Sequence, residues 1–272
     1  PRIQLIGLTE KFANYASGSG TTQLVFSYPV VTGDNDIDGL ALNANTLSLN
    51  TTGTIMSAGG NAATLTHSAV TTQAAHKVDA IAPIMTVSAS PTTVSSGGTS
   101  TVTFTASEAT STFELADVSA TLGTVSNFQT VSSTSYTATF TASPSVGGTA
   151  VVSITLGSFT DAAGNATTST ALSITIDSAA PTPTVATSSV TTASGVTVKS
   201  SEVGTAYLVK STVTVTNLAS ITAAAADSKS QVTITATNTD TSMPTTGLIA
   251  GEYKLYVIDA AGNLSAASAN IV

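Results

Sequence analysis

Polar and hydrophobic residues alternate along several short runs of this chain, as they do in β-strands that bury one face. In residues 100–106 the period of two puts Val102 and Phe104 on one face, with threonines opposite them. The same alternation occurs in three further segments, residues 135–141, 172–176 and 253–257. Gly, Pro, Asn or Ser clusters bound each run, which is typical of the strands of a β-sandwich. The pattern therefore predicts an all-β chain.

Residues 221–229 have helical character, because they include four consecutive alanines at positions 223–226. Nine residues are too few for a helix to be stable by itself. We therefore expect one helical turn or a loop between strands in this segment.

Two short motifs occur twice in the chain with the same spacing. The pentapeptide Asp-Ala-Ala-Gly-Asn occupies residues 161–165 and again residues 259–263, which begin 98 residues later. An Asp followed by Pro four residues on occurs at Asp79 and, again 98 residues later, at Asp177. A common offset for two separate motifs indicates a tandem array of domains about one hundred residues long.

The linker prolines place the predicted domain boundaries near residues 81 and 180, because proline interrupts ladder pairing. The predicted domains are residues 1–81, 82–179 and 180–272. The second and third are long enough to bury a core of their own.

Composition narrows the classes of function. Only 8% of the residues are charged, against about 25% in ordinary globular proteins, while 42% are hydrophobic. The net charge of −8, from 15 acidic and 7 basic residues, argues against binding to nucleic acid and favours a surface that binds cations. The chain has no cysteine. No apolar run approaches the roughly 18–20 residues of a membrane span.

Several motifs of the second predicted domain belong to one recognisable pattern, at residues 101–108, 136–140 and 160–166. These segments resemble the bacterial Ig-like repeats of giant surface adhesins and biofilm-associated proteins. Segments of the first and third predicted domains resemble other repeat types of the same kind, at residues 15–20, 26–28, 53–62, 204–209 and 251–265.

The resemblance implies three tandem immunoglobulin-like β-sandwiches in an elongated array, and a location outside the cell on a bacterial surface. It also implies that the first domain departs from the family. Ser57 stands where such repeats have an Asp, and the two strands that usually lead the domain are missing before Pro1. We expect either that the parent chain continues upstream or that the first domain self-associates or accepts a strand from a neighbouring subunit.

In an immunoglobulin-like sandwich, the loop after the second strand and the last hairpin lie at the end where the chain comes in. Two sets of residues are therefore expected to converge, one at each boundary: Asp79, Glu108, Asp161 and Asn165, and Asp177, Glu202, Asp259 and Asn263. Hard oxygen ligands on flexible loops suit Ca²⁺, which takes six to eight of them. The alternative is that Asp-Ala-Ala-Gly-Asn is only a turn, with Gly or Asn supplying positive φ.

A third acidic segment contains Asp34, Asp36 and Asp38, followed by Gly39, and begins like a calcium-binding loop. The twelfth position holds Asn45 rather than a glutamate, so we expect a strand-connecting loop that binds Ca²⁺ or a solvated acidic turn. His67 and His76 are the only histidines. Without cysteines beside them, surface histidines are favoured over a zinc site.

The sequence favours a structural role, as an extracellular stalk or fibre segment of a bacterial surface protein with junctions stiffened by Ca²⁺. An adhesive module that binds sugar or protein is one alternative, although the chain has no Trp for an exposed aromatic platform. An accessory segment of a secreted hydrolase is another. No nucleophile or acid–base pair stands in a recognisable context, so we expect no enzyme activity. The sequence does not identify an adhesion target.

Overall fold

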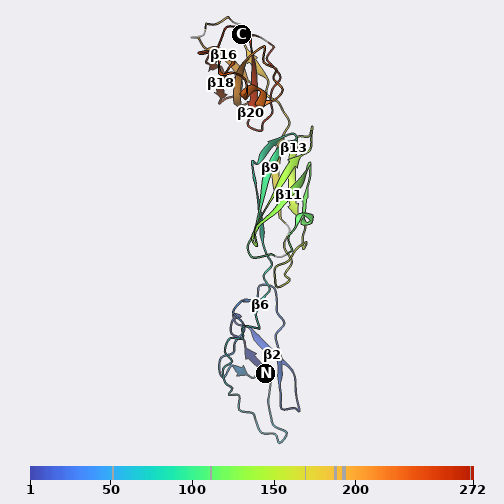
Figure 1. Ribbon diagram of the computed structural model, residues 1–272. Helices are drawn as coiled ribbons and strands as arrows, with labels where there is room; N and C mark the ends of the chain where they lie inside the picture. Colours follow the sequence, from blue (N-terminus) through green and yellow to red (C-terminus); the bar gives the residue numbers. More distant parts are fainter. Residues whose placement is uncertain (51, 111, 169, 187–188, 192–193, 270) are drawn as a thin grey trace. The chain divides into compact units, whose positions relative to one another are not determined.

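In a computed structural model, the regular secondary structure of the chain is almost entirely β-strand (Figure 1). It describes residues 1–50, 52–110, 112–168, 170–186, 189–191, 194–269 and 271–272. The described residues form two compact units. The first contains residues 1–84, 107–113 and 156–168, and the second contains residues 85–106, 114–155 and 169–272. The all-β prediction is confirmed, while the division into domains 1–81, 82–179 and 180–272 stays a prediction.

Two four-stranded sheets lie in the second unit. One has the order β11-β12-β9-β7, with strands β7 (Met85–Ser90), β9 (Thr99–Ala106), β11 (Gly123–Ser132) and β12 (Ser135–Ala142). The other has the order β10-β13-β14-β8, with strands β8 (Thr93–Ser95), β10 (Val118–Ala120), β13 (Gly148–Ile154) and β14 (Thr170–Asp177). All neighbouring strands are antiparallel except β14 and β8, which are parallel. A 3₁₀ turn, η1 (Leu115–Asp117), precedes β10.

The alternation read from the sequence is the cause of this arrangement. Val102 and Phe104 are both 0% exposed, and the register of β9 with β12 places them opposite Ala138 and Tyr136, which are also buried. Cross-strand pairs of this kind are the units that stabilise a sheet. Burying a side chain such as Phe104 contributes on the order of 2–3 kcal/mol.

The C-terminal part of the second unit contains two three-stranded sheets. The first, β15-β16-β19, has strands β15 (Pro183–Val185), β16 (Val196–Ser200) and β19 (Thr241–Met243). The second, β18-β17-β20, has strands β17 (Gly204–Lys210), β18 (Lys229–Ile234) and β20 (Tyr253–Asp259). One hydrophobic core takes side chains from both sheets, including Val198, Leu208 and Leu255, as in a sandwich.

A short helix covers the other face of the second of these sheets. Helix α1 (Leu218–Thr222) places Ile221 against Tyr207 and Val209 of β17. Asn217 caps it, because its side chain accepts a hydrogen bond from the Ser220 N–H at 2.9 Å. A 3₁₀ turn, η2 (Ala226–Ser228), follows. The predicted single helical turn is present, but it begins at Leu218 rather than at Ile221.

The first unit contains a four-stranded sheet and a two-stranded ribbon. The sheet, β3-β2-β1-β5, has strands β1 (Arg2–Gln4), β2 (Phe12–Ser17), β3 (Val25–Ser27) and β5 (Leu47–Ser48). The ribbon pairs β4 (Asn35–Asp36) with β6 (Val78–Asp79). Among the described residues of segment 1–84, three hydrophobic side chains are buried, those of Leu8, Ala13 and Val78. This segment is therefore much less well packed than the sandwiches.

Candidate functional site

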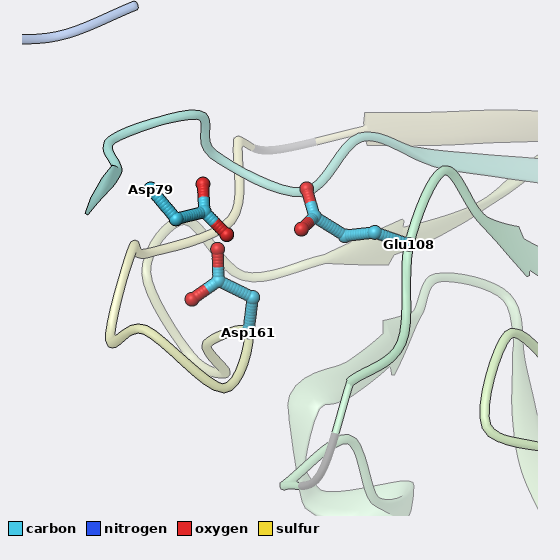
Figure 2. Close-up of side chains that lie close together, drawn as sticks. All are labelled: Asp79, Glu108 and Asp161. Atoms are coloured by element: carbon cyan, nitrogen blue, oxygen red, sulfur yellow. The ribbon is translucent and has the colours of Figure 1, made fainter. Parts of the chain in front are cut away.

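Three carboxylates of the first unit come together at one place. One oxygen from each of Asp79, Glu108 and Asp161 lies within 4.8 Å of the other two. Asp79 ends β6, Glu108 lies two residues after β9, and Asp161 lies in the loop between β13 and β14. Figure 2 shows the three carboxylates pointing toward one another from three separate segments. We call this group the first acidic cluster.

Backbone contacts fix the segments that carry this cluster. The Ser107 N–H donates to the Ile84 carbonyl at 2.8 Å, and the Ile84 N–H donates to the Ser107 hydroxyl at 2.9 Å. Thr110 forms an antiparallel bridge with Asp161. These contacts hold the segment that contains Glu108 beside both the linker and the Asp161 loop.

Asp161 is held by its own turn. Its Oδ1 accepts hydrogen bonds from the Ala163 N–H at 2.8 Å and from the Asn165 N–H at 2.9 Å. Gly164 has a φ of +94°, a left-handed conformation that glycine adopts without a steric penalty. Turn chemistry therefore accounts for Asp161 and Gly164, as the alternative interpretation of the motif required. It does not account for Asp79 or Glu108.

Asn165 connects two members of the first acidic cluster. Its Nδ2 donates to Asp161 Oδ2 at 2.8 Å and to the Asp79 carbonyl at 3.1 Å. The side chain thus joins the loop to the linker by donating hydrogen bonds. These contacts of Nδ2 give Asn165 a positioning role, and the predicted role of its Oδ1 as a metal ligand stays a prediction.

The electrostatic environment differs between the carboxyls. Burial, together with the neighbouring charges of Asp79 and Asp161, raises the pKa of Glu108. Burial also raises the pKa of Asp161, but hydrogen bonds from Asn165 and Ala163 outweigh it, so the net direction for that carboxyl is downward. Asp161 is only 3% exposed. Within the cluster, hydrogen bonds therefore stabilise the ionised form of Asp161, whereas burial and the neighbouring charges destabilise the ionised form of Glu108.

A second acidic cluster in the other unit repeats this construction. Oxygens of Asp177, Glu202 and Asp259 lie within 4.8 Å of one another. Asp177 ends β14, Glu202 lies two residues after β16, and Asp259 ends β20. Burial and the charges of Asp177 and Asp259 raise the pKa of Glu202, as in the first cluster.

The asparagine of the second motif has the same contacts. Asn263 Nδ2 donates to Asp259 Oδ2 at 2.8 Å and to the Asp177 carbonyl at 3.2 Å. Asp259 Oδ1 accepts hydrogen bonds from the Gly262 N–H and the Asn263 N–H at 2.7 and 2.8 Å. The repeated pentapeptide thus folds in the same way twice, and both times it lies beside a linker aspartate and a glutamate that follows a strand.

The third acidic segment is arranged differently. Asp34 Oδ2 accepts hydrogen bonds from the Tyr28 hydroxyl at 2.7 Å and the Val31 N–H at 2.9 Å, and Asp34 Oδ1 lies 3.4 Å from Lys11 Nζ. Tyr28, the Val31 N–H and Lys11 lower the pKa of Asp34.

Asp36 Oδ1 accepts a hydrogen bond from the Gly39 N–H at 2.9 Å, and Asp38 is exposed. Within the described part of the chain, Asp34, Asp36 and Asp38 do not form a cluster like the other two. Calcium binding by this segment stays a prediction.

The histidines have structural contacts. His67 Nε2 accepts hydrogen bonds from the Thr46 and Leu47 N–H groups at 2.9 and 3.2 Å, which places an acceptor nitrogen beside β5. His76 lines a shallow recess with Leu5 and Leu42. Neither belongs to a potential metal-binding group among the residues that the structure describes. A search of the same residues for a helix long and apolar enough to span a membrane finds none.

Comparison with known families identifies the middle of the chain. Residues 79–178 match the model of a family described as the bacterial Ig-like domain. The resemblance seen in the sequence is therefore confirmed for this segment. The matched segment contains the whole first acidic cluster and also Asp177 of the second. No curated protein matches the sequence significantly.

Several solved structures are similar to the chain at low identity. The adhesin InvE of Yersinia pseudotuberculosis is 21% identical, with a TM-score of 0.28, and the match covers 66% of this chain and 56% of the InvE chain. FdeC, described as an Escherichia coli adhesin, is 16% identical, with a TM-score of 0.29, and the match covers 78% of this chain and 71% of the other. The ligand-binding domain of human OSCAR is 16% identical, with a TM-score of 0.29, and the match covers 70% and 98%. With scores this low, the three likenesses carry no argument about function.

Proposed function

We propose that this chain is a structural segment of a bacterial surface protein, an extracellular stalk or fibre piece, and that Ca²⁺ bound at its two acidic clusters stiffens it. The observation that carries the proposal is the repetition of one arrangement. A linker aspartate, a glutamate after a strand and a turn aspartate bring their oxygens within 4.8 Å of one another, twice. The match of residues 79–178 to the bacterial Ig-like domain supports the choice of a surface protein.

A cation would change the balance of forces in each cluster. Three carboxylates at this spacing repel one another, and a bound divalent ion reverses the sign of the interaction. Ca²⁺ is the preferred cation because it accepts several oxygens in flexible geometry, whereas Mg²⁺ demands a near-ideal octahedron. Backbone carbonyls and water would complete the coordination shell.

The mechanical consequence follows from the positions of the ligands. Asp79 and Asp177 each lie four residues before a linker proline, at the predicted domain boundaries. A cation held by Asp79, Glu108 and Asp161 would tie the linker to two loops that are distant in sequence. Loss of the cation would leave the apolar cores folded and would make the linkers more flexible. In this role the carboxylates hold an ion and catalyse nothing.

The proposal is tested by adding CaCl₂ to metal-free protein and following NMR shifts of the Asn165 and Asn263 side-chain amides, which touch the two clusters. We expect both to move, with dissociation constants on the order of 10⁻⁴ to 10⁻³ M, the range of extracellular calcium modules. Glu108→Gln should abolish the response of Asn165 only, and Glu202→Gln that of Asn263 only.

Small-angle scattering in calcium and in chelator then measures the stiffening as a change in maximum dimension. Unmoved amides at a calcium concentration of roughly 10 mM would reject calcium binding. Binding with an unchanged maximum dimension would reject the stiffening.

A further inference from the structure

Little backbone pairing attaches the linker aspartate of the first acidic cluster to the rest of the first unit. Asp79 ends β6, and β6 pairs with β4 over two residue pairs. Beside this ribbon, the Ala80 N–H donates to the Asp34 carbonyl at 2.8 Å, and the Gly33 N–H donates to the Ala80 carbonyl at 2.9 Å. A two-stranded ribbon is marginally stable at best by itself, so other contacts have to keep Asp79 in place.

The linker aspartate of the second acidic cluster is held differently. Asp177 is the last residue of the eight-residue strand β14, which pairs with β13 over most of its length and with β8 at Asp177 itself. The Asp177 carbonyl also accepts a hydrogen bond from the Ser96 N–H at 3.2 Å. A four-stranded sheet therefore fixes Asp177, whereas Asp79 lies on a two-stranded ribbon.

The Asp34 side chain connects this ribbon to the four-stranded sheet of the first unit. Lys11 directly precedes β2 and Tyr28 directly follows β3, so both come from the ends of neighbouring strands of that sheet. Lys11 Nζ lies 3.4 Å from Asp34 Oδ1, and the Tyr28 hydroxyl donates to Asp34 Oδ2 at 2.7 Å. The Asp34 side chain is only 4% exposed, so water screens these contacts less than it screens a surface ion pair. We call Lys11, Tyr28 and Asp34 the anchoring network.

We propose that the anchoring network positions Asp79 for cation binding. By holding Asp34 it holds the backbone to which Ala80 is bonded, and so keeps the Asp79 carboxylate beside Glu108 and Asp161. All of these residues belong to the first unit. In this role the members of the network are positioning residues and not ligands of the ion. The inference rests on the calcium proposal above, and adds that the affinity of the first cluster depends on the network while that of the second does not.

The expected size of the effect follows from how often the ribbon is in place. The apparent dissociation constant of a site equals its intrinsic value divided by the fraction of molecules in the binding-competent arrangement. Removing one donor from Asp34 lowers that fraction, because hydrogen bonds to a charged group are among the stronger ones. We therefore expect calcium binding at the first cluster to weaken by at least about threefold.

Two variants each remove one donor from the network. Tyr28→Phe deletes a hydroxyl without changing the charge, and Lys11→Met removes the charge but keeps an unbranched side chain. The matched control is Lys77→Met, because Lys77 is exposed and lies only two residues before Asp79. Removing a positive charge should by itself strengthen calcium binding slightly. Weaker binding in Lys11→Met therefore has the opposite sign to a simple charge effect.

A calcium titration followed at the Asn165 and Asn263 side-chain amides measures both clusters in one sample. Tyr28→Phe and Lys11→Met should raise the dissociation constant reported by Asn165 by at least about threefold, and should leave the one reported by Asn263 unchanged. Lys11→Arg keeps the ion pair, so its value should stay within about twofold of the unmodified chain. Lys77→Met should not weaken binding at either cluster.

Hydrogen exchange in chelator tests the anchoring without any ion. The Ala80 amide donates to the Asp34 carbonyl, so it should exchange faster in Tyr28→Phe and Lys11→Met than in the unmodified chain or in Lys77→Met. The Leu5 amide, which donates to the Lys11 carbonyl at 2.9 Å beside the sheet, should exchange at an unchanged rate. A general loss of stability would instead speed both amides.

Two results would overturn this inference and leave calcium binding intact. One is a dissociation constant at Asn165 that is the same in Tyr28→Phe and in Lys77→Met. The other is exchange that becomes faster at Leu5 and Ala80 alike, since the variants would then act by general destabilisation. A failure of Asn165 to respond to calcium in the unmodified chain is a different result, because it rejects the calcium proposal and this inference with it.

Discussion

Replacing Glu108 with Gln should change stability in opposite directions with and without calcium. In the first acidic cluster, Glu108 lies near two other carboxylates, with one oxygen of each within 4.8 Å. At that distance each pair of charges repels by ~0.9 kcal/mol in a water-like dielectric, which applies because Glu108 and Asp79 are partly exposed. Physiological salt roughly halves the sum of the two pairs, to about 1 kcal/mol.

In chelator, Glu108→Gln should therefore stabilise the first unit locally by about 1 kcal/mol. In calcium, Glu108→Gln should instead destabilise the first unit, because the variant has lost a ligand of the ion. A site with a dissociation constant of ~10⁻⁴ M stabilises its folded state by ~2.7 kcal/mol in roughly 10 mM calcium. The variant should lose most of that gain.

Hydrogen exchange of the Ser107 amide measures this locally, since its N–H donates to the Ile84 carbonyl beside the cluster. Glu252→Gln is the matched control, because Glu252 is exposed and belongs to neither cluster. A Glu108→Gln effect with the same sign in both buffers would refute the electrostatic reasoning. So would an effect equal to that of the control.

Three further predictions concern pH, the asparagine bridge and the core. The pKa of Glu108 is raised in the folded state, so in chelator its protonated form contributes stability fully below about pH 4.5, the ordinary pKa of the carboxyl. That contribution should be lost as the pH rises through the folded pKa. In denaturant titrations, Glu108→Gln should flatten this part of the plot of unfolding free energy against pH. Asn165→Ala should speed exchange of the Ser107 amide by an amount equivalent to about 1–3 kcal/mol, since two hydrogen bonds are lost, and unchanged exchange would contradict its positioning role. Phe104→Ala should lower the unfolding free energy by about 3–5 kcal/mol, against less than about 0.5 kcal/mol for Val131→Ala, because Phe104 is wholly buried and Val131 is exposed.

The strands and the convergence of both acidic clusters could be predicted because each leaves a pattern in the sequence itself. The period of two around Val102 and Phe104 sets which face is buried, and burial then determines the register. The 98-residue offset of the repeated motifs pairs Asp79 with Asp177. Glu108 was identified by its place at the end of a strand.

Other features depend on partners that lie far away in the sequence. Asp34 has the spacing of a calcium loop, but Lys11 and Tyr28 reach it from other segments, and no local motif indicates this. The direction of the Asn165 amide depends on the Asp79 carbonyl, 86 residues away. The start of α1 was missed for a different reason. Alanine content indicates a helical segment from Ile221 on, whereas the capping signal that starts the helix lies earlier, at Asn217 and Ser220.

A turn and a cation site are not equal explanations of the repeated motif. The turn needs one aspartate, whose Oδ1 accepts two backbone N–H groups, and this need is met in both copies. It gives no reason for a glutamate and a linker aspartate to lie within 4.8 Å of that carboxylate, where each adds repulsion. Only 15 acidic residues occur in the chain, and six of them are placed in these two clusters. A repulsive arrangement built twice from so few charges is the observation on which the proposal of a bound cation rests, and calcium titration of the two clusters tests it.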